Sequence, residues 1–205
     1  MTTLVKICGL RDRETVDAAV ACGADAVGFV FADSVRRVTT AEAKAAAANV
    51  PDDVLRVAVM LHPSREEWNE VAENFRPDVL QTDIDDFDYL DVPADIRRWP
   101  VIREGSATVT GMPDTFVYEG RHSGKGQRVD WSRAAQIARS GNMILAGGLA
   151  PSNVAAAISE VAPFGVDVSS AVESRPGVKD LHRIEMFIAA AKGAAGEVNE
   201  FRNKE

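Results

Sequence analysis

Short apolar segments of the kind that form buried strands alternate with amphipathic helical segments along nearly the whole chain. Eight segments are predicted to be strands: residues 4–8, 26–31, 54–60, 78–81, 99–103, 115–118, 143–146 and 165–168. Most of the segments between them have a helical spacing of apolar residues, with boundary residues such as Asp12 and Gly23. This alternation favours a sheet in which all strands are parallel.

A doubly wound sheet and a closed barrel both satisfy the alternation. The stretch between the fifth and sixth strands, residues 104–114, has room for at most one short helix. A length of about 200 residues is the lower edge of the TIM-barrel range, which fits one reduced unit. The pattern and the length leave both folds open. Together with the motifs described below, they lead us to predict an α/β fold: a (β/α)8 TIM barrel with an all-parallel closed sheet and a reduced helix after strand 5. Residues 1–196 would form this single domain, and residues 197–205 a polar C-terminal tail.

Composition argues against several classes of partner. The formal net charge is −8, whereas binding a nucleic-acid backbone requires clustered Lys and Arg. No apolar run approaches the roughly 20 residues that cross a bilayer, and the N-terminus lacks the apolar stretch of a signal peptide. The two cysteines, Cys8 and Cys22, have no metal-ligand spacing. We expect a cytoplasmic protein with no nucleic-acid or membrane partner, no metal and no cofactor.

In a parallel barrel the active site lies at the carboxyl ends of the strands. The polar side chains expected there are Cys8, Arg36, Gln81, Asp83, Glu119 and Asp167. The segment from Gly147-Gly148 follows strand seven, and the segment from Ser169-Ser170 follows strand eight. Each alone is typical of a tight turn. Together they favour a phosphate site built from backbone N–H groups, because TIM barrels often bind phosphate at these two loops.

Two of these residues can be interpreted either as structural or as catalytic. Cysteine is among the most buried residue types, so Cys8 can simply pack, although its place beside Gly9 at the catalytic end of the strand favours chemistry. Glu119 follows an apolar strand and is either solvated or a partly desolvated acid with a raised pKa. The residues alone leave both alternatives open. His62 is expected to be a loop residue.

Several motifs, in this order, resemble the phosphoribosylanthranilate isomerase family over nearly the whole chain. The matching segments are residues 5–9 (VKICG), 23–31 (GADAVGFVF), 124–126 (GKG), 129–132 (VDWS), 145–149 (LAGGL), 165–170 (GVDVSS) and 172–173 (VE). The Gly-Gly loop is shared with many phosphate-binding barrels, whereas the ordered set is specific to this family.

The resemblance implies an Amadori rearrangement in tryptophan biosynthesis. The substrate would be N-(5'-phosphoribosyl)anthranilate and the product the 1-deoxyribulose isomer. Cys8 matches the family's general base, and a thiolate is a competent proton acceptor. Glu119 matches the general acid, which is an aspartate in the family, so the longer side chain is a departure. We expect the backbone to compensate, and Asp114 is the alternative source of the proton.

The same resemblance assigns the binding residues. Arg36 would face the anthranilate carboxylate, because a guanidinium offers a planar fork of donors, and Arg37 is its possible substitute. Asp167 and Gln81 would bind substrate. The phosphate would lie against Gly147, Gly148, Ser169, Ser170 and Ala171. Ala171 stands where the family has glycine, and Asp83 where it usually has histidine.

Two other functions fit part of the pattern. A different phosphosugar isomerase would usually need paired aspartates after strands one and five, where Cys8 and Arg103 stand. A non-catalytic phosphosugar-binding barrel is motivated by the departures at Asp83, Glu119 and Ala171, but binding alone would not need Cys8. In every case the expected partner is a small phosphosugar, bound by a monomer or homodimer.

Overall fold

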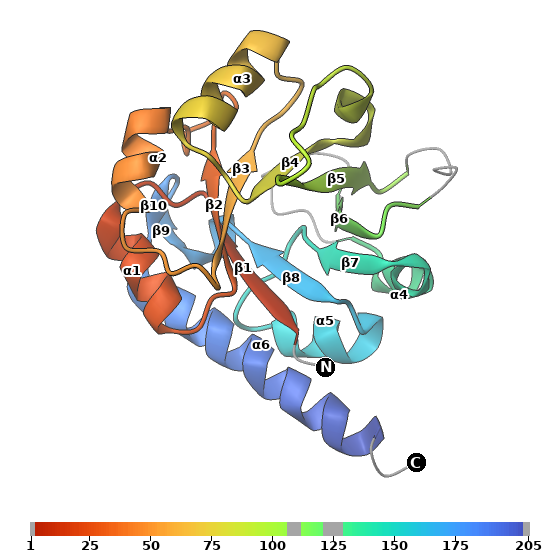
Figure 1. The fold of residues 1–205 in the computed structure, drawn as a ribbon. Helices are drawn as coiled ribbons and strands as arrows, with labels where there is room; N and C mark the ends of the chain where they lie inside the picture. Colours follow the sequence, from red (N-terminus) through yellow and green to blue (C-terminus); the bar gives the residue numbers. More distant parts are fainter. Residues whose placement is uncertain (1–2, 106–111, 121–128, 203–205) are drawn as a thin grey trace.

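The protein is a closed barrel of eight parallel strands. A computed structural model describes residues 3–105, 112–120 and 129–202. The strands are β1 Leu4–Cys8, β2 Ala26–Val30, β3 Leu55–Val59, β4 Val79–Asp83, β5 Arg97–Arg103, β6 Thr115–Glu119, β7 Asn142–Leu145 and β8 Gly165–Val168. Each strand pairs in parallel with the next, and β8 pairs with β1 to close the ring (Figure 1). The predicted TIM barrel is confirmed.

Helices surround much of the barrel on its outer side (Figure 1). They are α1 Arg13–Ala21, α2 Thr40–Ala46, α3 Arg65–Asn74, α4 Trp131–Ile137, α5 Val154–Val161 and α6 Leu181–Arg202. Local chemistry sets their starts: Asp12 accepts a hydrogen bond from Thr15 N, and Ser64 forms a capping box with Glu67. Within the described residues, no helix has the length and apolar character needed to span a membrane.

Two connections and the C-terminal segment have features that the sequence pattern did not predict. After β4 a short 3-10 helix, η1 Ile84–Asp88, leads to β5, and its Asp86 accepts hydrogen bonds from His62 and Tyr89. After β8, a 3-10 turn, η3 Ser170–Val172, precedes a small hairpin of β9 Glu173–Arg175 and β10 Val178–Lys179. Helix α6 continues to Arg202, so the expected polar tail is helical for most of its length.

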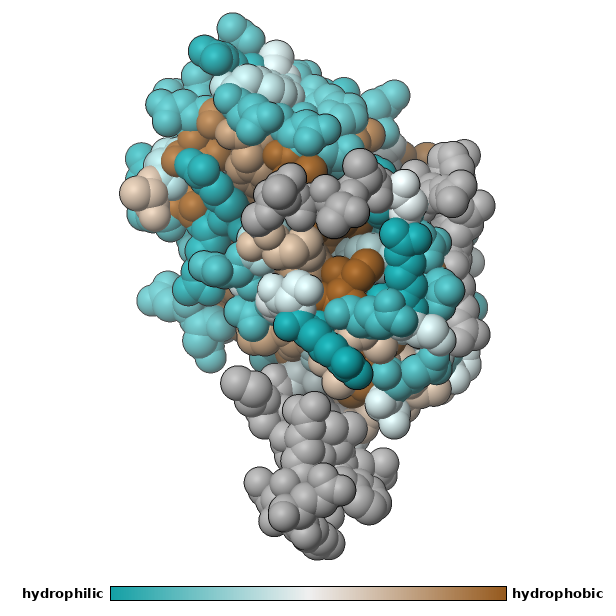
Figure 2. Space-filling model, turned by 90° about the vertical axis from the view of Figure 1, so that its right-hand side faces the viewer, coloured by the Kyte–Doolittle hydropathy of each residue, from teal (hydrophilic) through white to brown (hydrophobic). Residues whose placement is uncertain are grey.

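The predicted reduced helix after the fifth strand lies partly outside the described residues. Residues 104–105 and 112–114, which are described, contain no helix. Figure 2 turns the right-hand side of Figure 1 toward the viewer, and this face is largely hydrophilic with separate apolar areas.

Two apolar cores follow from the alternation of side chains along each strand. Outward residues such as Val5, Ile7 and Leu80 pack under the helices. Inward residues fill the barrel with a second cluster: Ala26, Val57, Val79, Trp99, Val101, Val117, Ile144 and Ala146. Continuing the inward alternation to the carboxyl ends of the strands reaches polar side chains instead. The fold therefore places the polar site on top of the inner core.

We expect Phe187→Ala to lower the free energy of unfolding by about 3–5 kcal/mol, because this residue of α6 has a fully buried ring and truncation leaves a cavity. Met186 is the neighbouring residue and is 48% exposed, so Met186→Ala is the matched control and should change stability by less than about 0.5 kcal/mol. Denaturant unfolding of both variants measures the difference. Equal losses would contradict this packing of α6.

Candidate active site

The inward alternation brings ionisable groups from five strands to one end of the barrel. They are Cys8 on β1, Asp83 on β4, Arg103 on β5, Glu119 on β6 and Asp167 on β8. Each lies two or four residues beyond an inward-facing position of its strand, and all are at the carboxyl end. The predicted site residues are thus gathered at one mouth. Asp114 precedes β6 and lies at the opposite end, so the alternative acid is wrong for geometric reasons.

A buried charged cluster surrounds Cys8. Lys6 is completely buried, and its Nζ donates a hydrogen bond to Asp167 Oδ1 at 3.0 Å. Burial lowers the pKa of Lys6, but the charges of Asp167 and Cys8 outweigh it and raise the pKa above its usual value. Burial raises the pKa of the Cys8 thiol, and the Lys6 ammonium opposes that shift. Lys6 is a functional candidate that the sequence reasoning missed.

Two glycines make room for this cluster. A Cβ on Gly28, which pairs with Cys8 across β1 and β2, would lie 3.1 Å from Cys8 Sγ and 3.2 Å from Lys6 Cε. Gly9 has a positive φ of 75°, and a Cβ there would lie 2.6 Å from Arg36 Cδ. The absence of both side chains therefore lets the thiol, the ammonium and the guanidinium approach one another.

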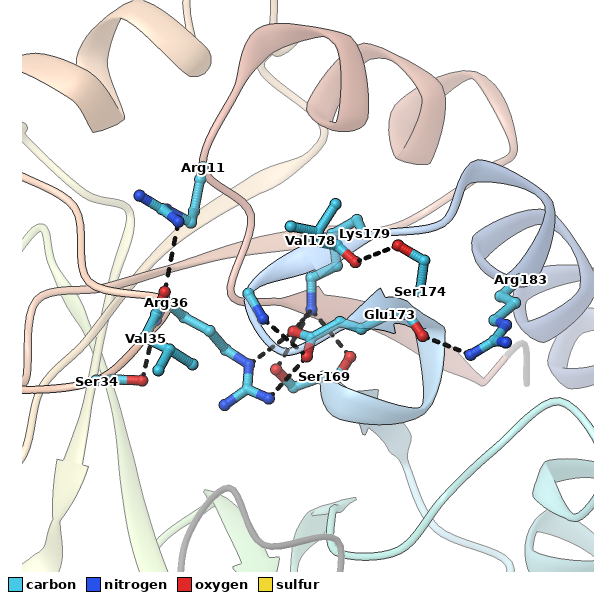
Figure 3. A network of polar contacts seen from close by, with 11 residues as sticks. Arg11, Ser34, Val35, Arg36, Ser169, Glu173, Ser174, Val178, Lys179 and Arg183 are labelled. Carbon is cyan, nitrogen blue, oxygen red and sulfur yellow. Dashed lines mark hydrogen bonds and ion pairs between the residues drawn. The ribbon is translucent and has the colours of Figure 1, made fainter.

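Arg36 is held by a partner that the sequence reasoning missed. Its Nε and Nη2 donate to the two carboxylate oxygens of Glu173 at 2.7 and 2.9 Å, and Lys179 Nζ donates to Glu173 at 3.0 Å (Figure 3). Burial alone would raise the pKa of Glu173, but the hydrogen bonds from Arg36 and Lys179 lower it to about 2. Arg37 is outside this network and lines a groove beside α2 and α3.

A chain of alternating charges crosses the opposite side of the mouth, from β3 to β6. Arg103 donates to Glu119 Oε1 at 2.6 Å and to the two oxygens of Asp83 at 2.6 and 3.3 Å. His62 Nε2 lies 3.4 Å from Asp83, and its Nδ1 lies 2.9 Å from Asp86. The hydrogen bond that the His62 ring donates to Asp86 raises the pKa of His62. His62 is a loop residue, as expected, but belongs to this chain of charges.

Gln81 is buried on the inner face of β4. Among the described residues, its Oε1 has no hydrogen-bond partner. A buried amide oxygen without a partner is costly, so a ligand donor at this position would be favourable.

The two predicted phosphate loops lie side by side after β7 and β8. Gly147 and Gly148 have φ angles of 85° and 68°, a conformation that favours glycine. The Asn153 side chain fixes this loop by donating to Gly148 O at 2.9 Å and accepting from Ala150 N at 2.8 Å.

The β8 loop is fixed in a different way. Ser169 O accepts from Lys179 Nζ at 2.9 Å, and Ser170 and Ala171 form the η3 turn. Ala171 does not have a positive φ, so the turn accommodates alanine where the resemblance predicts glycine.

A cavity among the described residues lies beside the mouth and not over Cys8. It measures about 940 Å³ and runs between α2 and α3, past Phe31, Arg37 and His62. None of the predicted catalytic residues lines it. Its acidic rim, with Glu42 and Glu67 among its members, does not suit a phosphosugar. The convergence of the ionisable groups therefore locates the site better than cavity size does.

The chain is a closed parallel barrel, and the mouth at the carboxyl ends of its strands carries a buried thiol, opposed carboxylates and a glycine loop. This combination is typical of enzymes with the TIM-barrel fold. Comparison with known proteins narrows this class. The model of the family "N-(5'phosphoribosyl)anthranilate (PRA) isomerase" matches residues 5–190. The chain therefore belongs to the N-(5'-phosphoribosyl)anthranilate isomerase family.

Relatives and solved structures agree with this assignment. The N-(5'-phosphoribosyl)anthranilate isomerase of Streptococcus mutans is 36% identical over 192 residues, which are 93% of this chain and 99% of that protein. The enzyme of Roseiflexus castenholzii is 37% identical over 94% of this chain and 99% of its own.

Two solved structures give the same picture. The phosphoribosylanthranilate isomerase of Thermotoga maritima has a TM-score of 0.80 at 31% identity, over 93% of this chain and 99% of its own. A second isomerase structure, in complex with reduced 1-(o-carboxyphenylamino)-1-deoxyribulose 5-phosphate, has a TM-score of 0.76 at 32% identity, over 93% and 99% of the two chains. The motif at residues 124–126 lies outside the described residues.

The charge of Lys6 should tune the reactivity of Cys8. Because the Lys6 ammonium lowers the pKa of the thiol, Lys6→Met should raise that pKa, reduce the thiolate fraction at a given pH and move the midpoint of alkylation to higher pH. Alkylation by iodoacetamide is followed against pH in a Cys22→Ser background, since Cys22 is exposed. Lys44→Met removes an exposed lysine as the matched control. A midpoint that stays in place in Lys6→Met would refute the electrostatic link.

Proposed function

We propose that this protein converts N-(5'-phosphoribosyl)anthranilate to 1-(2-carboxyphenylamino)-1-deoxyribulose 5-phosphate, an Amadori rearrangement of tryptophan biosynthesis. The observation that carries the proposal is the family match over residues 5–190 together with a thiol and a carboxyl group at one barrel mouth. It acts in the cytoplasm, without metal or cofactor, as a monomer or homodimer. A solved relative from Thermotoga maritima is described as dimeric.

Glu119 is the general acid in this proposal. It gives a proton to the furanose ring oxygen while the C1–O bond breaks, which opens the sugar to a protonated Schiff base. Arg103 donates a hydrogen bond to Glu119 Oε1 and so fixes the position of the carboxyl group. A neighbouring guanidinium favours the ionised form of a carboxyl group, but Arg103 also binds both oxygens of Asp83. Sharing Arg103 between two carboxylates reduces the charge available to either one.

Cys8 is the general base. As a thiolate it removes the proton from sugar C2, and the C–H electrons neutralise the iminium to give an enolamine. The enolamine then tautomerises to the ketone: C1 gains a proton, and the C2 hydroxyl loses its proton to form the carbonyl. The site supports the thiolate with the Lys6 ammonium and excludes water, because Cys8 is only 6% exposed. A thiol whose pKa is raised by burial becomes a stronger proton acceptor once it is ionised.

The remaining site residues hold the two ends of the substrate. Arg36 binds the anthranilate carboxylate, Asp167 contacts the substrate near its anthranilate end, and Gln81 also binds the substrate. The phosphate lies on the backbone of the two carboxyl-end loops, at Gly147, Gly148, Ser169, Ser170 and Ala171. The positive φ angles of the two glycines support this assignment, because they open the backbone to close approach by a ligand.

Complementation of a tryptophan auxotroph that lacks this isomerase tests the function. The wild-type chain should restore growth, and Cys8→Ser and Glu119→Gln should each reduce turnover by about 10²- to 10⁴-fold, the usual contribution of acid–base catalysis. Cys22→Ser and Glu185→Gln change exposed residues of the same types and should retain activity. Wild-type protein that binds the reduced product analogue but gives no turnover would support the non-catalytic alternative instead.

We expect the length of the Glu119 side chain to match the geometry of this barrel mouth. Shortening it in Glu119→Asp retracts the carboxyl group by about one C–C bond from the position at which Arg103 holds it. Misplacement of roughly 1 Å costs on the order of a hundredfold in rate, so we expect kcat to fall by about that factor. Steady-state kinetics of the purified variant measure it. Unchanged or improved kcat would show that the backbone does not compensate for the longer side chain.

A further inference from the structure

We propose that Glu173 is a positioning residue for Arg36: it binds one edge of the guanidinium and so aims the other edge at the carboxylate of the ligand. The inference rests on the proposed function, in which Arg36 binds that carboxylate. Glu173 lies on the β9–β10 hairpin, which no prediction from the sequence included. Its carboxylate faces the guanidinium of Arg36, which lies on the β2–α2 loop (Figure 3).

The geometry of the contact leaves Arg36 available for a ligand. A guanidinium has five N–H donors in one plane. Glu173 takes one from Nε and one from Nη2, at 2.7 and 2.9 Å, along the side edge of the group. The end edge, formed by Nη1 and the second N–H of Nη2, is a separate fork that matches a second carboxylate. A guanidinium fixed on its side edge is thus preorganised on its end edge.

Glu173 is itself held rigidly. Its Oε1 also accepts from Lys179 Nζ at 3.0 Å, and its Oε2 also accepts from Gly177 N at 3.2 Å. Arg183 donates to the Glu173 backbone carbonyl (Figure 3). The Glu173 side chain is only 3% exposed, so little water competes for these bonds. Such a carboxylate cannot swing toward the ligand and serves as a fixed support.

The hairpin also supports the loop that carries Arg36. Gly177 has a φ of 79°, and a Cβ there would lie 2.7 Å from the Val35 carbonyl oxygen. The same carbonyl accepts from Arg11 Nη1 at 3.4 Å (Figure 3). The hairpin therefore touches the residue directly before Arg36 as well as its side chain, and two separate contacts fix the direction of the guanidinium.

The charge of the cluster fits a single anionic group. Arg36 and Lys179 contribute two positive charges and Glu173 one negative charge, so the three residues carry a net charge of +1. Glu173 competes with the ligand for Arg36, and a role as competitor alone would make its removal strengthen binding. If Glu173 positions Arg36, its removal should weaken ligand binding. The sign of the effect therefore separates the two.

Glu173→Gln tests the inference through the affinities of two ligands. One is reduced 1-(o-carboxyphenylamino)-1-deoxyribulose 5-phosphate, and the other is the same molecule without the ring carboxyl group. We expect Kd of the first to rise by about 10- to 100-fold, the usual effect of losing the partner of a ligand-binding group, and Kd of the second to change little. In turnover, KM should rise more than kcat falls. Glu185→Gln is the matched control.

Each other result overturns the inference. Equal weakening of both ligands would indicate a general structural role, and unchanged or tighter binding of the first ligand would indicate a spectator or a competitor. If Glu173→Gln does not fold, the double variant Glu173→Gln/Lys179→Met removes the pair without leaving a buried ammonium unpaired, and the same ratio of affinities is measured. Failure of the proposed function would appear separately, as wild-type protein without turnover.

Discussion

A buried ion pair sits at the seam where the barrel closes, and the site is arranged around it. Lys6 on β1 and Asp167 on β8 are partners in the register of the closing strand pair, and their side chains meet inside the barrel at 3.0 Å. Neither charge could be left there alone, because an unpaired buried charge costs several kcal/mol. Cys8 is two residues beyond Lys6 on the same face, so the pairing that closes the barrel also sets the charge next to the thiol.

The mouth has two polar halves with different electrostatic character. Around β1, β8 and the β9–β10 hairpin, two lysines and Arg36 outnumber the carboxylates, which suits an anionic ligand and a thiolate. Around β4 to β6, the carboxylates of Asp83 and Glu119 both contact the guanidinium of Arg103. The two halves of the mouth draw their charged groups from different strands.

Local patterns predicted the strands and the end of the barrel at which the candidate residues gather, because strand alternation and loop glycines are encoded over a few residues. The choice of the barrel over a doubly wound sheet needed the ordered family motifs as well. Cys8, Glu119 and the loop glycines follow from position at a strand end. Strand-end position did not predict their partners Lys6, Glu173 and Arg103, because these contacts join residues far apart in the chain. Glu173 and Arg36, for example, are separated by 137 positions. A lysine inside an apolar strand was the one local signal that was available and unused.

The departures from the family resemblance make physical sense as a set around Arg103. A histidine at position 83 would offer this guanidinium at most one neutral acceptor, and Glu119 would then face nearly its whole positive charge. Asp83 instead takes two of its donors, so the carboxylates of Asp83 and Glu119 share one guanidinium. Such sharing reduces the charge that Arg103 directs at either carboxylate. The aspartate at 83 and the longer acid at 119 are two parts of one arrangement, linked by Arg103.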